Sequence, residues 1–239
     1  MIGLGTLINT AAIIAGGICG LLFGKLLKAD HQDTLSKTCG IAVLFIGIAG
    51  ALEGMLTVED GSVLSGNAML VVICLSLGAL VGELLNIEGA FERFGQWLKI
   101  KTGNAKDKQF VEGFVTASLT VCIGAMAIVG AIQDGIEGNY TILATKAVLD
   151  LIIIMVMTCS LGKGCIFSAL PVAVLQGSVT LLARLIRPVM TQAALDNLSM
   201  IGSILIFCVG VNLLWGKKVR VANMLPSVVI AVIAAFLPI

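Results

Sequence analysis

About eight long apolar segments follow one another along the chain, and they limit the folds that it can adopt. Each is about 17–23 residues long, the length of an α-helix that crosses the hydrocarbon core of a bilayer. Only 12% of the residues are charged, whereas soluble domains carry about 25%. The pattern predicts an all-α, polytopic transmembrane helix bundle that forms a single domain over residues 1–239. The predicted spans are Gly5–Leu27, Thr38–Leu56, Ala68–Leu85, Phe110–Ile132, Tyr140–Leu161, Cys165–Ile186, Leu198–Trp215 and Val221–Leu237.

The distribution of lysine and arginine predicts how the bundle is oriented. Cytoplasmic loops of membrane proteins are enriched in these residues, and four alternate loops of this chain hold most of them. This pattern places both termini on the outer face of the membrane. Arg184 and Arg187 fall on the poorly charged side, so the sixth span could instead tilt or end in an interfacial turn. The basic loops contain Lys25, Lys28 and Lys37; Arg93, Lys99, Lys101, Lys106 and Lys108; Lys163; and Lys217, Lys218 and Arg220.

The connection between the third and fourth spans has an amphipathic pattern. Phe91, Phe94, Trp97 and Leu98 recur at intervals of three to four residues, and charged residues stand between them. This pattern is typical of a helix that lies in the plane of the membrane interface. We therefore expect a short interfacial helix here, which serves as an anchor or as a gate.

Two parts of the chain resemble each other weakly. The segment GIAVLFIGIAGAL from Gly40 parallels GSILIFCVGVNLL from Gly202, and because five spans separate them, they would be inserted in opposite senses. The pattern predicts an inverted-topology repeat of spans 1–3 (residues 1–86) and spans 6–8 (residues 164–239), which flank the helix pair 110–161. Inverted repeats are common in secondary transporters, whose binding sites lie near the bilayer midplane. Divergent, unrelated apolar helices are the alternative interpretation.

The fifth span, YTILATKAVLDLIIIMVMTCSL, contains two ionisable residues. Asp150 lies about 15 Å along this helix, near the middle of a hydrocarbon core about 30 Å thick, and Lys146 precedes it by one turn. A charge at this depth costs about 2.5–3.5 kcal/mol and marks a functional site by default. Two interpretations are open. Lys146 and Asp150 could form a structural ion pair, with Lys146 directed outward, or Asp150 could bind a proton or cation at a gated site.

Other polar and helix-breaking residues stand near the middle or the ends of neighbouring spans. We expect substrate- or ion-binding groups beside Asp150 and Lys146, and we expect several glycines and a proline to bend helices or let them pack closely. The polar candidates are Asn9, Ser118, Thr120, Asp134 and Gln176. The helix-break and packing candidates are Gly16, Gly20, Gly24, Gly124, Gly130, Pro171 and Gly177.

The sequence offers little support for several other functions. Its seven cysteines include no CxxC pair, and its single histidine, His31, has no companion at ligand spacing, so no metal site and no cofactor are expected. The sequence contains no HExxH or GxSxG motif and no paired catalytic carboxylates, so these signatures of enzymes are missing. No basic tract with interleaved aromatic residues indicates a nucleic-acid partner.

Four motifs carry a resemblance to a known family: GLGTLINTAAIIAGGICGLLFG, SLTVCIGAMAIVGAIQDGIEG, TKAVLD and ALPVAVLQG. Together they resemble the YqgA-type family of bacterial integral membrane proteins, a domain of unknown function, over nearly the whole chain. The resemblance implies a multi-pass protein of the bacterial plasma (inner) membrane and supplies no substrate. The motifs fall on Asn9, Ser118, Gly124, Gly130, Asp134, Gly135, Lys146, Asp150, Pro171, Gln176 and Gly177.

The leading functional hypothesis is a secondary transporter of a small solute or ion, with a midplane polar site around Asp150. One alternative is an oligomeric ion channel, in which the polar residues line a pore and the glycine ridges form the contacts of a homo-oligomer. A second alternative is a membrane scaffold or regulatory protein that transports nothing. The expected partners are the lipid bilayer and an unidentified small solute or ion.

Overall fold

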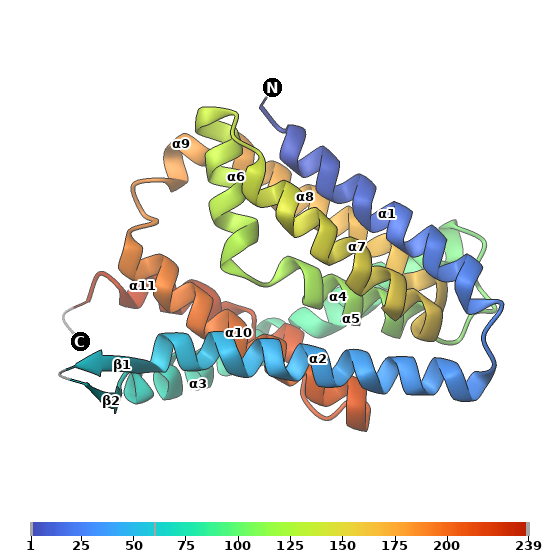
Figure 1. Cartoon of the computed structure of the whole chain (residues 1–239), viewed down its shortest axis with the longest axis horizontal. Coiled ribbons are helices and arrows are strands. Elements are labelled where there is room, and N and C mark those ends of the chain that lie inside the picture. The colour runs from blue at the N-terminus through green and yellow to red at the C-terminus, as the bar shows by residue number, and fades with distance from the viewer. Residues whose placement is uncertain (1, 60, 238–239) are drawn as a thin grey trace.

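The computed structural model describes residues 2–59 and 61–237, and the chain folds into a bundle of helices with one short hairpin (Figure 1). The predicted all-α polytopic bundle is confirmed, because five helical segments are long and apolar enough to cross a membrane. The elements are α1 (Leu4–Gly24), α2 (Ala29–Met55), β1 (Leu56–Glu59), β2 (Ser62–Ser65), α3 (Ala68–Leu85), α4 (Ile87–Lys101), α5 (Phe110–Cys122), α6 (Ala125–Glu137), α7 (Thr141–Leu161), the 3₁₀ helix η1 (Gly162–Ser168), α8 (Ala169–Leu181), α9 (Ala183–Ile186), α10 (Gln192–Trp215), the 3₁₀ helix η2 (Val221–Met224) and α11 (Pro226–Ala234).

The predicted spans correspond to the observed helices in different ways. The predicted first, second, third and seventh spans correspond to α1, α2, α3 and α10, whereas the fifth and sixth fall within the one apolar segment Thr141–Leu181. The bent pair α5–α6 adds a sixth segment if it is counted as one span, and the predicted last span corresponds to the shorter apolar segment Val221–Ala234. The total of about eight therefore stays a prediction.

The predicted fourth span, Phe110–Ile132, is divided into two helices, and the expected bend at Gly124 is a full break. The chain breaks after α5, and α6 continues at an angle of 63° to it. Gly124 stands at the break with φ 143° and ψ 148°, a backbone conformation that is essentially restricted to glycine. The break therefore depends on the missing side chain at this position, and it divides the predicted fourth span into two half-helices.

The chain reverses direction between α7 and α8. A side chain at Gly130 of α6 would meet Leu143, near the start of α7, and one at Gly135 would meet the backbone of Thr180, near the end of α8. Since both contacts involve α6, the start of α7 and the end of α8 lie at the same end of the bundle. Gly162, with φ 78°, stands where α7 ends and the turn begins.

The basic loops gather at one end of the bundle, here called the basic end. The Gln32 side chain donates to the Gly24 carbonyl at 2.8 Å, and Ser160 of α7 donates to the Gln32 carbonyl at 2.8 Å. The start of α1 and the end of α11 lie at the other end, here called the opposite end, where Asn197 of α10 donates to the Ala231 carbonyl at 3.2 Å. In Figure 1 the connection between α1 and α2 closes the right side of the view, and α11 lies in its left half.

Three helix pairs pack antiparallel across the bundle, namely α1 with α8, α2 with α10, and α3 with α11. Glycines allow the close approach: Gly47 of α2 faces Phe207 of α10, and Gly78 of α3 faces Ser227 of α11. α1 also runs parallel to α7. There its predicted ridge of Gly16, Gly20 and Gly24 packs against the α7 backbone. This ridge therefore forms a packing contact within the chain.

The interfacial segment forms the predicted short helix, α4. Its Leu98 is buried against Phe110 and Phe114 of α5, while the Phe94 and Trp97 rings stack on each other with centroids 5.7 Å apart and stay largely exposed. This half-buried arrangement suits an amphipathic helix at a membrane surface. The β1–β2 hairpin at the far end of α2 was not predicted. Leu56, predicted to end the second span, instead begins β1 and pairs with Ser65.

Apolar side chains occupy both the inside and the outside of the bundle. The main core joins α1, α2, α5, α7 and α10 through residues such as Ile13, Val43, Ile154 and Leu205. Large apolar side chains also cover the outer surface, and Leu181 is 84% exposed. An exposed apolar surface of this extent requires a partner phase, and lipid contacts such a surface without cost.

Candidate functional site

The helix break lies beside the only ion pair in the described structure whose two members are both buried. Lys146 and Asp150 of α7 pair with each other and are 7% and 4% exposed. Lys146 also donates to the Val121 carbonyl at 2.8 Å. In a continuous helix that carbonyl would accept the N–H of residue 125, so the break leaves it free. Lys146 therefore points to the carboxyl-terminal end of α5, where the helix dipole favours a cation, and not outward.

An amide pair stands next to this ion pair. Asn9 of α1 donates through its Nδ2 to the Oε1 of Gln176 of α8 at 3.3 Å, and the Asn9 side chain also lies beside the Asp150 carboxyl group. Both amides are buried, yet Asn9 Oδ1 and Gln176 Nε2 have no hydrogen-bond partner in the described part of the chain. Four of the seven predicted site residues thus come together from three helices, and two of their polar atoms are free for a ligand.

Asp134 lies apart from this group, near the opposite end. Its side chain is 0% exposed, and its Oδ2 accepts the N–H of Gly5 at 3.1 Å, in the first turn of α1. Thr6 of α1 and Thr180 of α8 follow towards the midplane, with their hydroxyl oxygens 3.5 Å apart. Asp134 therefore marks the start of a buried polar layer that leads along α1 towards Asn9.

Ser118 and Thr120 are not arranged as ligands. The Ser118 hydroxyl donates to the Phe114 carbonyl at 2.6 Å, and the Thr120 hydroxyl donates to the Thr116 carbonyl at 2.8 Å. Such bonds to the preceding turn satisfy a buried hydroxyl within its own helix and often bend that helix slightly. In this conformation the two hydroxyl groups form hydrogen bonds within α5 and none with the polar site.

Two predicted helix breaks do not occur. Pro171 lies in the first turn of α8, where the missing N–H breaks no intrahelical hydrogen bond. The irregular backbone lies before it, in η1. Gly177 continues the helix, and a side chain added there would meet nothing within 4 Å, so it neither bends α8 nor packs closely.

The sequence-predicted residues do not line the cavity that enters from the basic end. This cavity has a volume of about 370 Å³ and follows α5 from Val111 through Val115 to Leu119, opposite Val209 of α10. A shallower hollow of about 720 Å³ adjoins it under α4 and shares Val111 with it. Since Leu119 lies only four residues before Ile123, the cavity ends about one helical turn, or about 6 Å, from the break.

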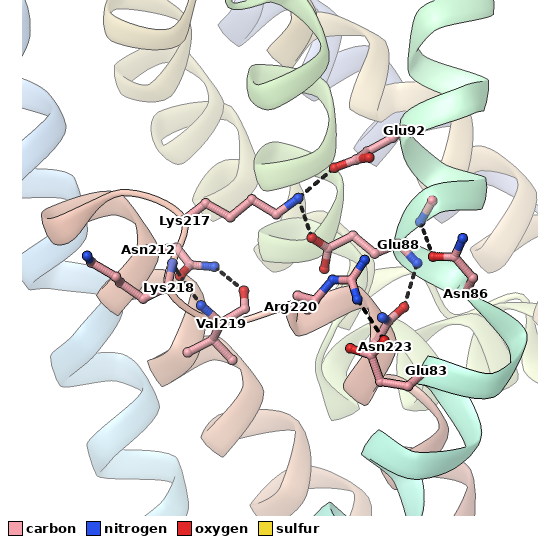
Figure 2. A network of polar contacts seen from close by, with 11 residues as sticks. Glu83, Asn86, Glu88, Glu92, Asn212, Lys217, Lys218, Val219, Arg220 and Asn223 are labelled. Carbon is pink, nitrogen blue, oxygen red and sulfur yellow. Dashed lines mark hydrogen bonds and ion pairs between the residues drawn. The ribbon is translucent and has the colours of Figure 1, made fainter.

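An ionic network stands at the mouth of this cavity (Figure 2). Lys217, which follows α10, pairs with Glu88 and Glu92 of α4, each at 2.5 Å. The Glu88 side chain is 4% exposed, whereas that of Lys217 is 56% exposed. Partial burial alone would lower the pKa of Lys217, but its hydrogen bonds to Glu88 and Glu92 outweigh this effect and raise the pKa. The network therefore keeps its lysine charged.

Neighbouring groups fix the same corner of the molecule. Arg220 pairs with Glu83 of α3 at 2.7 Å, and Asn223 of η2 accepts the Glu88 N–H at 2.7 Å. Asn212 of α10 accepts the N–H of Val219 at 2.9 Å and donates to its carbonyl at 2.7 Å. Figure 2 shows these side chains converging from α3, α4, α10 and η2. The network joins the α3–α4 corner to the α10–η2 connection.

Sequence reasoning did not assign a role to Glu88 or Lys217. Both lie in loops or at helix ends rich in exposed charges, so nothing in the sequence separates a buried carboxylate from its solvated neighbours. Within the described residues, no three histidine, cysteine, aspartate or glutamate side chains gather as a metal site. The seven cysteines are free thiols.

The fold and the polar groups can now be compared with known proteins. The family model "Protein of unknown function (DUF554)" matches residues 4–236. The chain belongs to this family. It is similar to the "Uncharacterized membrane protein YdfK" of Bacillus subtilis (strain 168), with 31% identity over 97% of this chain and 95% of that protein. It is also similar to the "Uncharacterized protein YqgA" of Escherichia coli (strain K12), with 27% identity over 95% of this chain and 94% of that protein. No solved structure matches the chain. The matches confirm the family resemblance and a membrane protein.

Proposed function

We propose that this protein is a secondary transporter of a small solute or ion, and that its site lies at the α5–α6 break beside Lys146 and Asp150. The observation that carries the proposal is the contact of buried Lys146 with both Asp150 and the freed Val121 carbonyl. Transporters of several folds build their sites near the midplane from discontinuous helices, whose half-helix ends and free carbonyls hold ions or substrates. Here the Lys146 ammonium group donates to the free carbonyl.

Access to this site is favoured from the basic end. The cavity along α5 reaches Leu119, and the buried side chain of Leu119 separates it from the break by about one turn. The enrichment of lysine and arginine at this end assigns it to the cytoplasm, and a multi-pass protein of the bacterial inner membrane with both termini outside follows from that assignment. In this conformation the cavity opens towards the cytoplasm, and the Leu119 side chain closes the route from the cavity to the helix break.

The helix pairing supports an inverted repeat. Each helix predicted for the first unit, α1, α2 and α3, packs antiparallel against its predicted counterpart, α8, α10 and α11. A two-fold axis in the membrane plane generates such pairs. Alternating access follows from rocking one unit against the other around a fixed site. A ligand that binds Asp150 replaces Lys146 as its partner, and it shifts the conformational equilibrium to the extent that it binds the two states differently.

A screen followed by uptake tests the proposal. Purified protein is screened against ions and small metabolites for ligands that raise its thermal stability, and uptake of each ligand is then measured in proteoliposomes. We expect Asp150→Asn to abolish uptake while the protein stays folded. Asp33→Asn is the matched control, because Asp33 forms an exposed pair with Lys37 at the same spacing.

Three outcomes would overturn the proposal. Wild-type uptake by folded Asp150→Asn would remove the site from the transport mechanism. Single-molecule currents far above the turnover of a carrier would replace the transporter with the channel. Failure of every compound to bind, together with a large loss of stability in Asp150→Asn, would assign Lys146 and Asp150 to scaffolding.

A further inference from the structure

A ladder of buried polar groups connects the opposite end of the bundle to the helix break. On α1 and α8 it passes from Thr6 and Thr180 to Asn9 and Gln176, and α7 continues it with Asp150. The first step is Asp134 of α6, which binds the backbone of α1 one residue before Thr6. These groups are buried, with none more than 7% exposed, so their polar atoms need partners other than bulk water.

Asp134 is the group in this ladder whose charge has no partner. Asp150 has Lys146, but no ion pair within residues 2–59 and 61–237 includes Asp134. Its Oδ2 accepts one backbone N–H, and its Oδ1, although fully buried, accepts no hydrogen bond from the residues that the structure describes. Burial of a charge without a counter-charge is strongly unfavourable. The arrangement therefore calls for one positive charge beside Oδ1.

We propose that Asp134 is the anchor of a sodium site, and that the bound ion is the coupling ion of the proposed transporter. The groups nearest to it in the ladder supply neutral oxygens, the hydroxyls of Thr6 and Thr180, and Asn9 Oδ1 one turn further on is also unpaired. Carboxylate, hydroxyl and amide oxygens are the ligands of hard cations. This inference rests on the proposed function only for the role of the ion, not for its binding.

The charge of the site selects the ion. A calcium site combines several carboxylates, whereas Asp134 is the one carboxylate of this layer, so a monovalent cation balances it.

The position of the site links it to the helix break. Asp134 lies in α6, and Gly124 begins the same helix at the break. Sodium that joins Asp134 to α1 and α8 would fix the opposite end of α6, and so restrict the angle between α5 and α6. Occupancy of the ion site thereby changes the backbone that surrounds Lys146 and Asp150, which is the coupling that a sodium-driven transporter needs.

Sodium binding to the purified protein tests the inference without any transport assay. Thermal unfolding in detergent is followed in sodium, potassium and choline chloride at constant ionic strength. We expect sodium alone to raise the unfolding temperature saturably, because it binds the folded state. Asp134→Asn should abolish the increase, since the amide oxygen keeps the Gly5 hydrogen bond but lacks the charge. Glu137→Gln, an exposed position one turn on, should retain it.

The outcomes separate this inference from the proposed function. No sodium-specific increase in wild type, or an unchanged increase in folded Asp134→Asn, would overturn the sodium site and leave the Asp150 uptake test standing. If Asp134→Asn does not fold, Thr180→Val decides. Weaker sodium affinity supports the site, and unchanged affinity overturns it. Loss of uptake in Asp150→Asn with the sodium response intact would support both.

Discussion

The two ends of the bundle treat a buried carboxylate in opposite ways. At the basic end Glu88 is paired with Lys217, and Asn223 holds its backbone. At the opposite end Asp134 is more deeply buried, yet it has a backbone N–H for one oxygen and nothing for the other. A buried carboxylate with a cationic partner holds the elements around it in place. A buried carboxylate with one unpartnered oxygen could still accept a ligand at that oxygen. The difference separates a paired carboxylate at the mouth of a cavity from a half-paired one at the proposed ion site.

Lys146→Met should have the largest effect, because it leaves Asp150 as a buried charge without a partner. We expect a loss of about 3–5 kcal/mol in the free energy of unfolding, measured by unfolding in mixed micelles. Lys217→Met is the comparison at the basic end. It leaves the buried Glu88 carboxylate without its cation, but Lys217 itself is half-exposed, so we expect a smaller loss of about 1–2 kcal/mol. The double variant Lys146→Met/Asp150→Asn should recover much of the loss. Equal losses for the two lysines would break the contrast between the midplane and the basic end.

Gly124→Ala tests the backbone between the two ends. A residue with a Cβ at φ 143° pays about 1–3 kcal/mol in strain, or forces α5 and α6 towards a continuous helix and removes the carbonyl that Lys146 binds. The control is Gly177→Ala, which meets open space and should stabilise its helix by up to about 1 kcal/mol. Circular dichroism measures whether Gly124→Ala gains helix, and unfolding measures whether it loses stability relative to Gly177→Ala. A stable Gly124→Ala variant with full uptake would show that the break is dispensable.

The sequence was sufficient for the apolar helices and for the polar groups between them. Hydropathy identifies α1, α3 and α10 because lipid exposure demands long apolar runs, and Asp150 is conspicuous because a charge is rare there. Gly124 was expected to bend its helix or to let it pack closely, but the sequence did not show which of the two it does, since glycine occurs in many packed helices and only the backbone angles identify the break. Pro171 misled in the other direction, because its effect depends on its place within the helix.

The ionic network was beyond sequence reasoning for a related reason. Glu88 and Lys217 are separated by most of the chain, and each looks like an ordinary surface charge until the fold joins α4 to the end of α10. Buried apolar residues recur at the helical repeat, so the sequence shows them. A single buried carboxylate in an amphipathic helix does not recur, so the sequence does not distinguish it from exposed ones. Long-range pairing of charges is fixed by tertiary structure and leaves no local pattern.

Glu88→Gln and Glu92→Gln compare two partners of one lysine. Glu88 is buried and Glu92 is 46% exposed, so the same removal of charge should cost about 1–2 kcal/mol at Glu88 and about 0–1 kcal/mol at Glu92. Unfolding at low and high salt checks the difference, because salt screens the exposed pair more strongly. A larger loss at Glu92 would show that the cavity mouth is held from its surface and not from its buried side.

The smallest expected effect is the pH dependence of the basic end. The pKa of Lys217 is raised above its ordinary value of 10.5, so the pairing contributes stability that is fully present below that value and is lost as the pH rises through the folded-state pKa. The difference in unfolding free energy between wild type and Lys217→Met should therefore be constant around neutral pH and shrink only in strong alkali. Arg220→Met is the control, because arginine stays protonated throughout this range, and its difference from wild type should persist. A Lys217 contribution that already fades near neutral pH would mean that the cavity mouth opens under physiological conditions, and the contrast between the paired Glu88 and the half-paired Asp134 would then disappear.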